Sequence, residues 1–143
     1  MSGLSHFLFA HLTQRLPCMS ARILIADDHP GARSALRLLL ASEPVEICGE
    51  AENGKQAVQK VRELNPDIVI LDLIMPEMSG IQAADEIRRI APATKLVFMS
   101  LYDTETVKVA NLIGPFVSKT TLVTELVPTL RSLMQTGEET DQH

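Results

Sequence analysis

Short apolar runs alternate with helix-periodic segments from residue 22 onward. Four of the runs are almost continuously apolar, as parallel strands covered on both faces must be: Ile23–Ala26, Ile68–Leu71, Leu96–Met99 and the shorter Phe116–Val117. The segment Val45–Glu50 instead alternates apolar and polar residues, which is typical of a half-covered strand at a sheet edge. The pattern therefore predicts five strands of a largely buried parallel sheet.

Five helical segments are expected between and after these strands. In the first three, apolar residues recur on one face at helical spacing: Ala32, Ala35, Leu36, Leu39 and Leu40; Ala57, Val58, Val61 and Leu64; and Ile81, Ala84, Ile87 and Ile90. Pro30 suits a first helical turn, and Asn53 and Ser79 are expected N-caps. A short helix around 104–112 and a last one from about 121 to 134 complete five βα units, which predicts an α/β fold.

Pro128 falls inside the last of these predicted helices. A proline there has no N–H to donate, and its ring clashes with the carbonyl four residues earlier, which belongs to Thr124. Since this costs about 3 kcal/mol, we expect a kink or an early break in the helix.

The length of 143 residues fits one domain with a proper core. The organised pattern covers residues 21–135, which we assign to the domain. We expect residues 1–20 to be a flexible N-terminal extension and residues 136–143 a flexible tail.

Charge and composition exclude several classes of function. A net charge of −5 argues against a nucleic-acid surface, which needs clustered Lys and Arg. Cys18 and Cys48 lack metal-ligand spacing and fit a reduced compartment. No stretch approaches the roughly 18 consecutive apolar residues of a membrane span. We therefore expect a cytoplasmic protein whose chain binds neither nucleic acid nor membrane.

Polar residues that could bind a ligand or take part in a reaction directly follow the predicted strands. Asp27 and Asp28 follow the first strand, Asp72 the third, Ser100 the fourth and Lys119 the fifth. The carboxyl ends of the strands of an open doubly wound sheet share one edge, where ligands bind. A single Asp at a strand end is more often a helix cap or a solvated loop residue. The coincidence of all these positions in one chain argues for a site instead.

Three crowded carboxylates repel one another, so the site needs cations to keep them ionised. Mg²⁺ prefers hard oxygen ligands and commonly bridges carboxylates to a phosphate. The formal charge of −3 from the three aspartates would be offset by +2 from the metal and +1 from Lys119. A phosphoryl group at Asp72 would have its oxygens met by the metal, Lys119 and Ser100, with Asp72 as the nucleophile.

The acidic pair, the stretch Asp72–Gly80 with the pattern D-x-x-M-P-x-x-x-G, Ser100 and Phe116–Lys119 resemble the receiver domain of bacterial two-component response regulators. The opening Asp27–Pro30 further resembles the receivers of the nitrate-regulator class. The resemblance covers about residues 20 to 135. It implies a flavodoxin-like, doubly wound (βα)5 fold with a five-stranded parallel sheet in the order 2-1-3-4-5. It also implies a phosphoacceptor signalling switch that takes its phosphoryl group from a sensor histidine kinase or a small phosphodonor.

The resemblance further implies the roles of individual residues. Mg²⁺ would be held by Asp28, Asp72 and the backbone carbonyl of Ile74, with Asp27 acting through water. Ser100 would move toward the new phosphate and Phe116 would turn inward, which is the two-state element of such switches. A plain core role for Phe116 has equal weight. The only catalysis implied is self-phosphorylation and autodephosphorylation, not enzymatic action on another substrate.

Several neighbouring residues have simpler interpretations. His29 is better interpreted as a solvated capping residue than as a metal ligand or phosphate relay. Met75 and Met78 are expected to pack, while Pro76 and Gly80 set the turn of their loop. Because the bulky side chains of Ile74 and Tyr102 flank the expected path of hydrolytic water, we expect slow spontaneous dephosphorylation.

The chain departs from the family on the face through which many receivers dimerise or signal. Fewer residues than usual separate Ser100 from Lys119, and Pro128 lies on the same face. No basic helix-turn-helix segment follows, so we expect either a chain that signals by protein contact alone or an excised domain. The downstream partner therefore stays unknown, and homodimer formation stays open.

Two alternatives remain to the phosphoacceptor switch. A pseudo-receiver would keep the fold and bind proteins without phosphorylation. A phosphatase with an aspartyl nucleophile would place an acid two residues after Asp72, where Ile74 stands instead.

Overall fold

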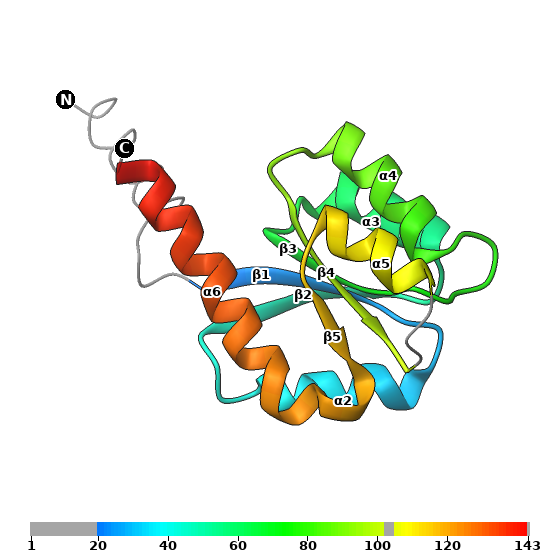
Figure 1. Cartoon of the computed structure of the whole chain (residues 1–143), viewed down its shortest axis with the longest axis horizontal. Helices are drawn as coiled ribbons and strands as arrows, with labels where there is room; N and C mark the ends of the chain where they lie inside the picture. The colour runs from blue at the N-terminus through cyan, green and yellow to red at the C-terminus, as the bar shows by residue number, and fades with distance from the viewer. Residues whose placement is uncertain (1–19, 102–104, 143) are drawn as a thin grey trace, which may run out of the picture.

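Five parallel strands form the single sheet of the computed structural model, which describes residues 20–101 and 105–142 (Figure 1). The order across the sheet is β2-β1-β3-β4-β5, and every neighbouring pair is parallel. This confirms the predicted flavodoxin-like fold. The strands are β1 (Ala21–Ala26), β2 (Val45–Ala51), β3 (Ile68–Asp72), β4 (Lys95–Ser100) and β5 (Phe116–Ser118).

Helices cover both faces of this sheet. On one face lie α2 (Pro30–Leu40) and α6 (Leu122–Gln142). On the other lie α3 (Gly54–Leu64), α4 (Gly80–Ile90) and α5 (Glu105–Ile113), as Figure 1 shows. A single 3-10 turn, η1 (Lys119–Thr121), connects β5 to α6. Among the described residues, no helix is both long enough and apolar enough to cross a bilayer.

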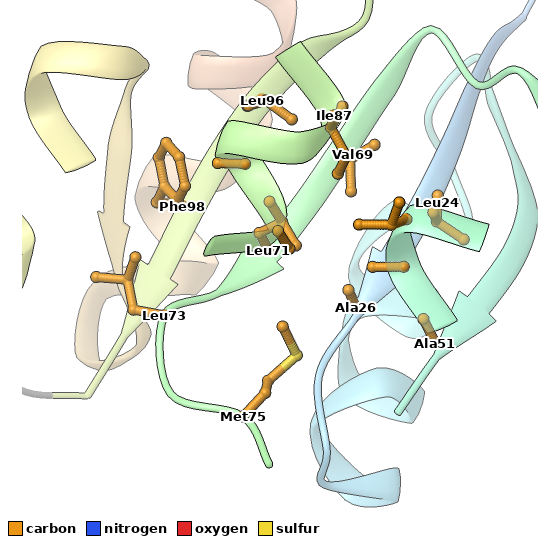
Figure 2. Packing of buried hydrophobic residues seen from close by; sticks show 14 of the residues in the cluster. Leu24, Ala26, Ala51, Val69, Leu71, Leu73, Met75, Ile87, Leu96 and Phe98 are labelled. Carbon is orange, nitrogen blue, oxygen red and sulfur yellow. The ribbon is translucent and has the colours of Figure 1, made fainter. Parts of the chain in front are cut away.

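Successive residues of β1 alternate between two hydrophobic clusters, one on each face of the sheet. Ile23 and Ile25 pack with Leu36 of α2 and Leu126 of α6. Leu24 and Ala26 face the other way, into the cluster shown in Figure 2. Burial on both faces is the physical reason for the continuously apolar strands seen in the sequence.

The predicted helix starts are largely confirmed. The side chain of Asn53 accepts a hydrogen bond from the amide of Gln56. Ser79 forms a reciprocal capping box with Gln82. Pro30 opens α2 as expected. His29 occupies the N-cap position and is exposed, as expected, although its side chain makes no capping hydrogen bond within the described part of the chain.

The end of the fold differs from the expectation at α6. The helix passes through Pro128 without interruption and continues to Gln142 rather than ending near Met134, so the predicted break is wrong. Leu126 and Leu130, which lie on either side of the proline, are both buried in the cluster under α6. Their burial holds the two halves of the helix on the same sheet face and offsets the lost hydrogen bond.

Candidate functional site

The structure brings the predicted residues together at the carboxyl edge of the sheet. Asp27 directly follows β1, Asp72 ends β3, and Lys119 directly follows β5. The ammonium nitrogen of Lys119 lies 2.7 Å from Oδ2 of Asp27 and 3.0 Å from Oδ2 of Asp72. Ser100 ends β4, is buried, and lies one residue beyond Met99, the register partner of Asp72. Segments far apart in the sequence thus meet at one point, as the strand-end argument predicted.

Asp27 is completely buried and is held through all of its polar atoms. Its amide donates to the carbonyl of Ala51 (3.0 Å), and its Oδ1 accepts from the amide of His29 (2.9 Å). Its Oδ2 faces Lys119, and its carbonyl accepts a hydrogen bond from Arg33 (2.6 Å). Oδ1 therefore has a hydrogen bond and Oδ2 an ion pair without hydrogen-bond geometry, and Asp27 is the buried inner member of the acidic pair.

Asp28 is the accessible member of that pair. Its side chain is 31% exposed, and its Oδ1 lies 3.1 Å from Nδ1 of His29, which is 72% exposed. Asp27, Asp28, His29 and Asp72 form a group whose potential ligand atoms all lie within 4.8 Å of one another. The sequence argument missed that His29 contacts the acidic pair, although its position immediately after Asp28 was the available signal.

Asp72 is 4% exposed and oriented by two hydrogen bonds. Its Oδ1 accepts from the amide of Ile74 (3.2 Å), and its Oδ2 accepts from Lys119 (3.0 Å). Burial raises the pKa of Asp72 above its ordinary value, and these two bonds offset part of that rise. The carboxylate is therefore fixed in direction and costly to ionise.

Lys119 supplies the positive charge between the carboxylates. Burial lowers its pKa, but its contacts with Asp27 and Asp72 outweigh burial, so the pKa of Lys119 lies above its ordinary value. The side chain is therefore a charged ammonium at neutral pH, placed to neutralise any anion that Asp72 receives.

Gly80 positions the loop after Asp72 through close contact. Its amide donates to the carbonyl of Leu73 (3.0 Å), and a Cβ at this position would lie 2.2 Å from the carbonyl oxygen of Asp72. The φ angle of Gly80 is not positive, so what this position needs is the absence of a side chain rather than a left-handed backbone. Met75 is buried in the cluster shown in Figure 2, which confirms its packing role.

The remaining predicted residues lie around this centre. Phe116 is half-buried against the cluster that contains Phe98, its register partner on β4. Met78 is also partly buried against that cluster, as expected. The side chain of Ile74 is largely exposed beside Asp72. Tyr102 lies outside the described residues.

The donor set of the acidic group fits a hard divalent cation. The aspartates offer carboxylate oxygens, which Mg²⁺ prefers over softer ligands, and Asp28 and Asp72 offer them from neighbouring strand ends. Formal repulsion among three carboxylates further favours a cation here.

Comparison with known sequences identifies relatives over most of the chain. The family model for the response regulator receiver domain matches residues 23–130. The chemotaxis protein CheY of Thermotoga maritima is 45% identical over 82 residues, which are 57% of this chain and 68% of that protein. The response regulator VraR of Staphylococcus epidermidis is 31% identical over 117 residues, covering 79% of this chain. That match spans 56% of VraR, so the chain covers little more than half of this relative.

Solved structures agree with the sequence relatives. The receiver domain of the putative response regulator NarL from Mycobacterium tuberculosis superposes with a TM-score of 0.74 at 30% identity, covering 82% of this chain and 98% of that one. A LuxR-family response regulator from Aurantimonas gives a TM-score of 0.75 at 29% identity, covering 81% and 86%. A chain of the CheX–CheY–BeF3–Mg complex from Borrelia burgdorferi gives 0.74 at 27% identity, covering 80% and 90%.

Proposed function

Because the chain belongs to the response regulator receiver domain family, we propose that it is a phosphoacceptor switch of a two-component system with Asp72 as the acceptor. The observation that carries this proposal is the Lys119 ammonium, which contacts Asp72 and Asp27 together at the carboxyl edge of the sheet. This arrangement pairs an oriented carboxylate with a charge that can neutralise a phosphoryl group.

The reaction that we propose is a phosphoryl transfer from a phosphohistidine of a sensor histidine kinase, or from a small phosphodonor. A carboxylate oxygen of Asp72 attacks the phosphorus atom, the bond from phosphorus to the donor breaks, and the donor leaves with its electron pair. The product is an acyl phosphate on Asp72. Lys119 and the hydroxyl of Ser100 would meet the phosphoryl oxygens, which is the positioning that such transfers require.

We assign the cation of this site to Mg²⁺, held by Asp28, Asp72 and the backbone carbonyl of Ile74, with Asp27 acting through water. Bound Mg²⁺ would neutralise charge that develops on the transferred group. The hard oxygen donors of the acidic group support this assignment. The hydrogen bond to Oδ1 and the ion pair of Oδ2 with Lys119, in a completely buried side chain, support the indirect role of Asp27.

Output would follow from a conformational change around the acceptor. Ser100 would draw toward the phosphate and the half-buried Phe116 would turn further inward, biasing one of two packed states. The partners would be a kinase, an unidentified downstream protein and, in one form of output, a second copy of the chain. We place this exchange in the cytoplasm and propose no enzymatic action on other substrates.

The proposal is tested by incubation with acetyl phosphate and Mg²⁺, followed by intact mass measurement. We expect a gain of one phosphoryl group, blocked by beryllofluoride and absent from Asp72→Asn. Asp85→Asn, which removes an exposed aspartate on α4, is the matched control and should gain the group normally. A folded wild-type chain that gains no mass would contradict the proposal.

A second candidate is a phosphorylation-independent interaction module. Val109 and Leu112 are both exposed on α5, three residues apart on one side of the helix, where a partner could cover them. A wild-type chain that gains no phosphoryl group from acetyl phosphate but still binds Mg²⁺ would favour this candidate. Pro128 gives this candidate no support, since α6 passes through it without a break.

A further inference from the structure

Arg33 is a basic residue of α2 that contacts the acidic pair through the backbone. Its Nη1 donates to the carbonyl oxygen of Asp27 at 2.6 Å. The side chain is only 12% exposed, although most arginines on helix surfaces extend into solvent. An arginine in this position is therefore held toward the site.

Glu50 of β2 anchors this arginine. Its Oε1 accepts a hydrogen bond from Nε of Arg33 at 2.8 Å, while its Oε2 accepts one from Arg37, one helical turn farther along α2. The carboxylate thus holds the guanidinium at Nε, while Nη1 reaches the carbonyl of Asp27. Arg33 uses its planar fork to join two groups at once, which a single ammonium could not do equally well.

The contact with the Asp27 carbonyl bears directly on Asp28. The carbonyl of Asp27 and the amide of Asp28 belong to one planar peptide unit. A hydrogen bond that fixes this carbonyl therefore also fixes the plane of the Asp28 amide, and with it the starting direction of the Asp28 side chain. Asp28 is the accessible carboxylate of the pair, and its direction decides how it meets a cation.

We infer that Arg33, anchored by Glu50, is a positioning residue that sets the Asp27–Asp28 peptide for cation binding. This inference rests on the proposed Mg²⁺ site and extends it to a residue that touches neither the cation nor the phosphoryl group. The contribution is geometric: the arginine is itself a positive charge, so by Coulomb repulsion alone it would weaken the binding of a cation.

The charge of Arg33 and its positioning of Asp28 would change Mg²⁺ affinity in opposite directions, so Arg33→Met can tell the two effects apart. If the arginine acted only through its charge, its removal would tighten Mg²⁺ binding. If it positions Asp28, its removal weakens binding, by about tenfold for a typical outer-shell partner of a metal ligand. Arg37→Met removes an equal charge from the same Glu50 carboxylate and is the matched control.

The experiment measures Mg²⁺ dissociation constants by isothermal titration calorimetry, with urea unfolding of each variant to verify its fold. We expect weaker binding in Arg33→Met and unchanged or tighter binding in Arg37→Met. Arg33→Lys keeps the charge but loses the fork, and should fall between wild type and Arg33→Met; it also serves if the methionine variant does not fold. Wild-type affinity in both Arg33 variants, with wild type binding Mg²⁺, would overturn this inference and leave the proposed acceptor role intact. A wild-type chain that binds no Mg²⁺ would overturn both.

Discussion

Asp72 is a buried carboxylate whose ionised form is opposed by its surroundings. Burial raises its pKa, while Lys119 and the Ile74 amide restore only part of the lost solvation. An acid with a raised pKa in the folded state makes the protein less stable above that pKa than below it. The Asp72 carboxylate therefore costs folding stability at neutral pH.

Asp72→Asn is accordingly expected to raise the free energy of unfolding at pH 7 in the presence of EDTA. The gain should shrink as the pH falls through the folded-state pKa toward the ordinary value of 3.8, because protonation relieves the wild-type chain of the same cost. Urea unfolding between pH 7 and pH 4 measures this difference, with Asp85→Asn as the control for net charge. A difference that does not vary with pH would contradict the assigned cause.

Gly80 shows a second constraint at a single residue. Gly80→Ala would force a Cβ against the Asp72 carbonyl, where relief requires a backbone shift, and should cost about 1–3 kcal/mol. Gly31→Ala is the matched control, since a Cβ there meets nothing within 4 Å and alanine favours a helix by about 0.5–1 kcal/mol. Chemical denaturation compares the two variants. Equal stability of both would show that the contact is easily relieved.

Individual site residues were predictable to different degrees. The convergence of Asp27, Asp72 and Lys119 followed from the rule that parallel strands share one carboxyl edge. Arg33 was missed because a basic residue in an amphipathic helix is normally solvated, and nothing local indicates its bond to Asp27. The contact that requires Gly80 lies between two ends of one loop and has no signature in sequence spacing.

Among the elements, α6 departs most from its prediction. Proline propensity argued for a break, but the sequence argument did not weigh the burial of Leu126 and Leu130 against the sheet. Tertiary packing of an amphipathic face commonly outweighs local propensity. Four of the strands were predictable because burial on both faces leaves a plain apolar run, and β2 was predictable from its alternation of apolar and polar residues.

Pro128→Ala is expected to stabilise α6, because alanine restores the amide that can donate to Thr124. The gain should be about 1–3 kcal/mol, depending on how far the helix has adapted to the proline. Gln135→Ala, an exposed substitution in the same helix, should change stability little. Thermal unfolding followed by circular dichroism gives both values. If Pro128→Ala is no more stable than Gln135→Ala, the helix geometry around Pro128 has already adapted to the missing hydrogen bond, which would contradict the expected gain.

On the scale of the whole molecule, the sheet order and the family agree with the sequence argument. The strand order β2-β1-β3-β4-β5 places the first strand beside the third, so the acidic pair and Asp72 become neighbours. Lys119, which follows β5, then reaches past the end of β4 to Asp72 at the same edge of the sheet. The fold thus explains how the site is assembled from residues that no local motif contains together.

Conversion of Asp72 itself to an acyl phosphate can be tested directly. After incubation with acetyl phosphate and Mg²⁺, borohydride reduction converts an aspartyl phosphate to homoserine, and peptide mass spectrometry then locates the changed residue. We expect homoserine at position 72, and only when both Mg²⁺ and the phosphodonor are present. Reduction at another aspartate, or at none in the folded protein, would contradict it.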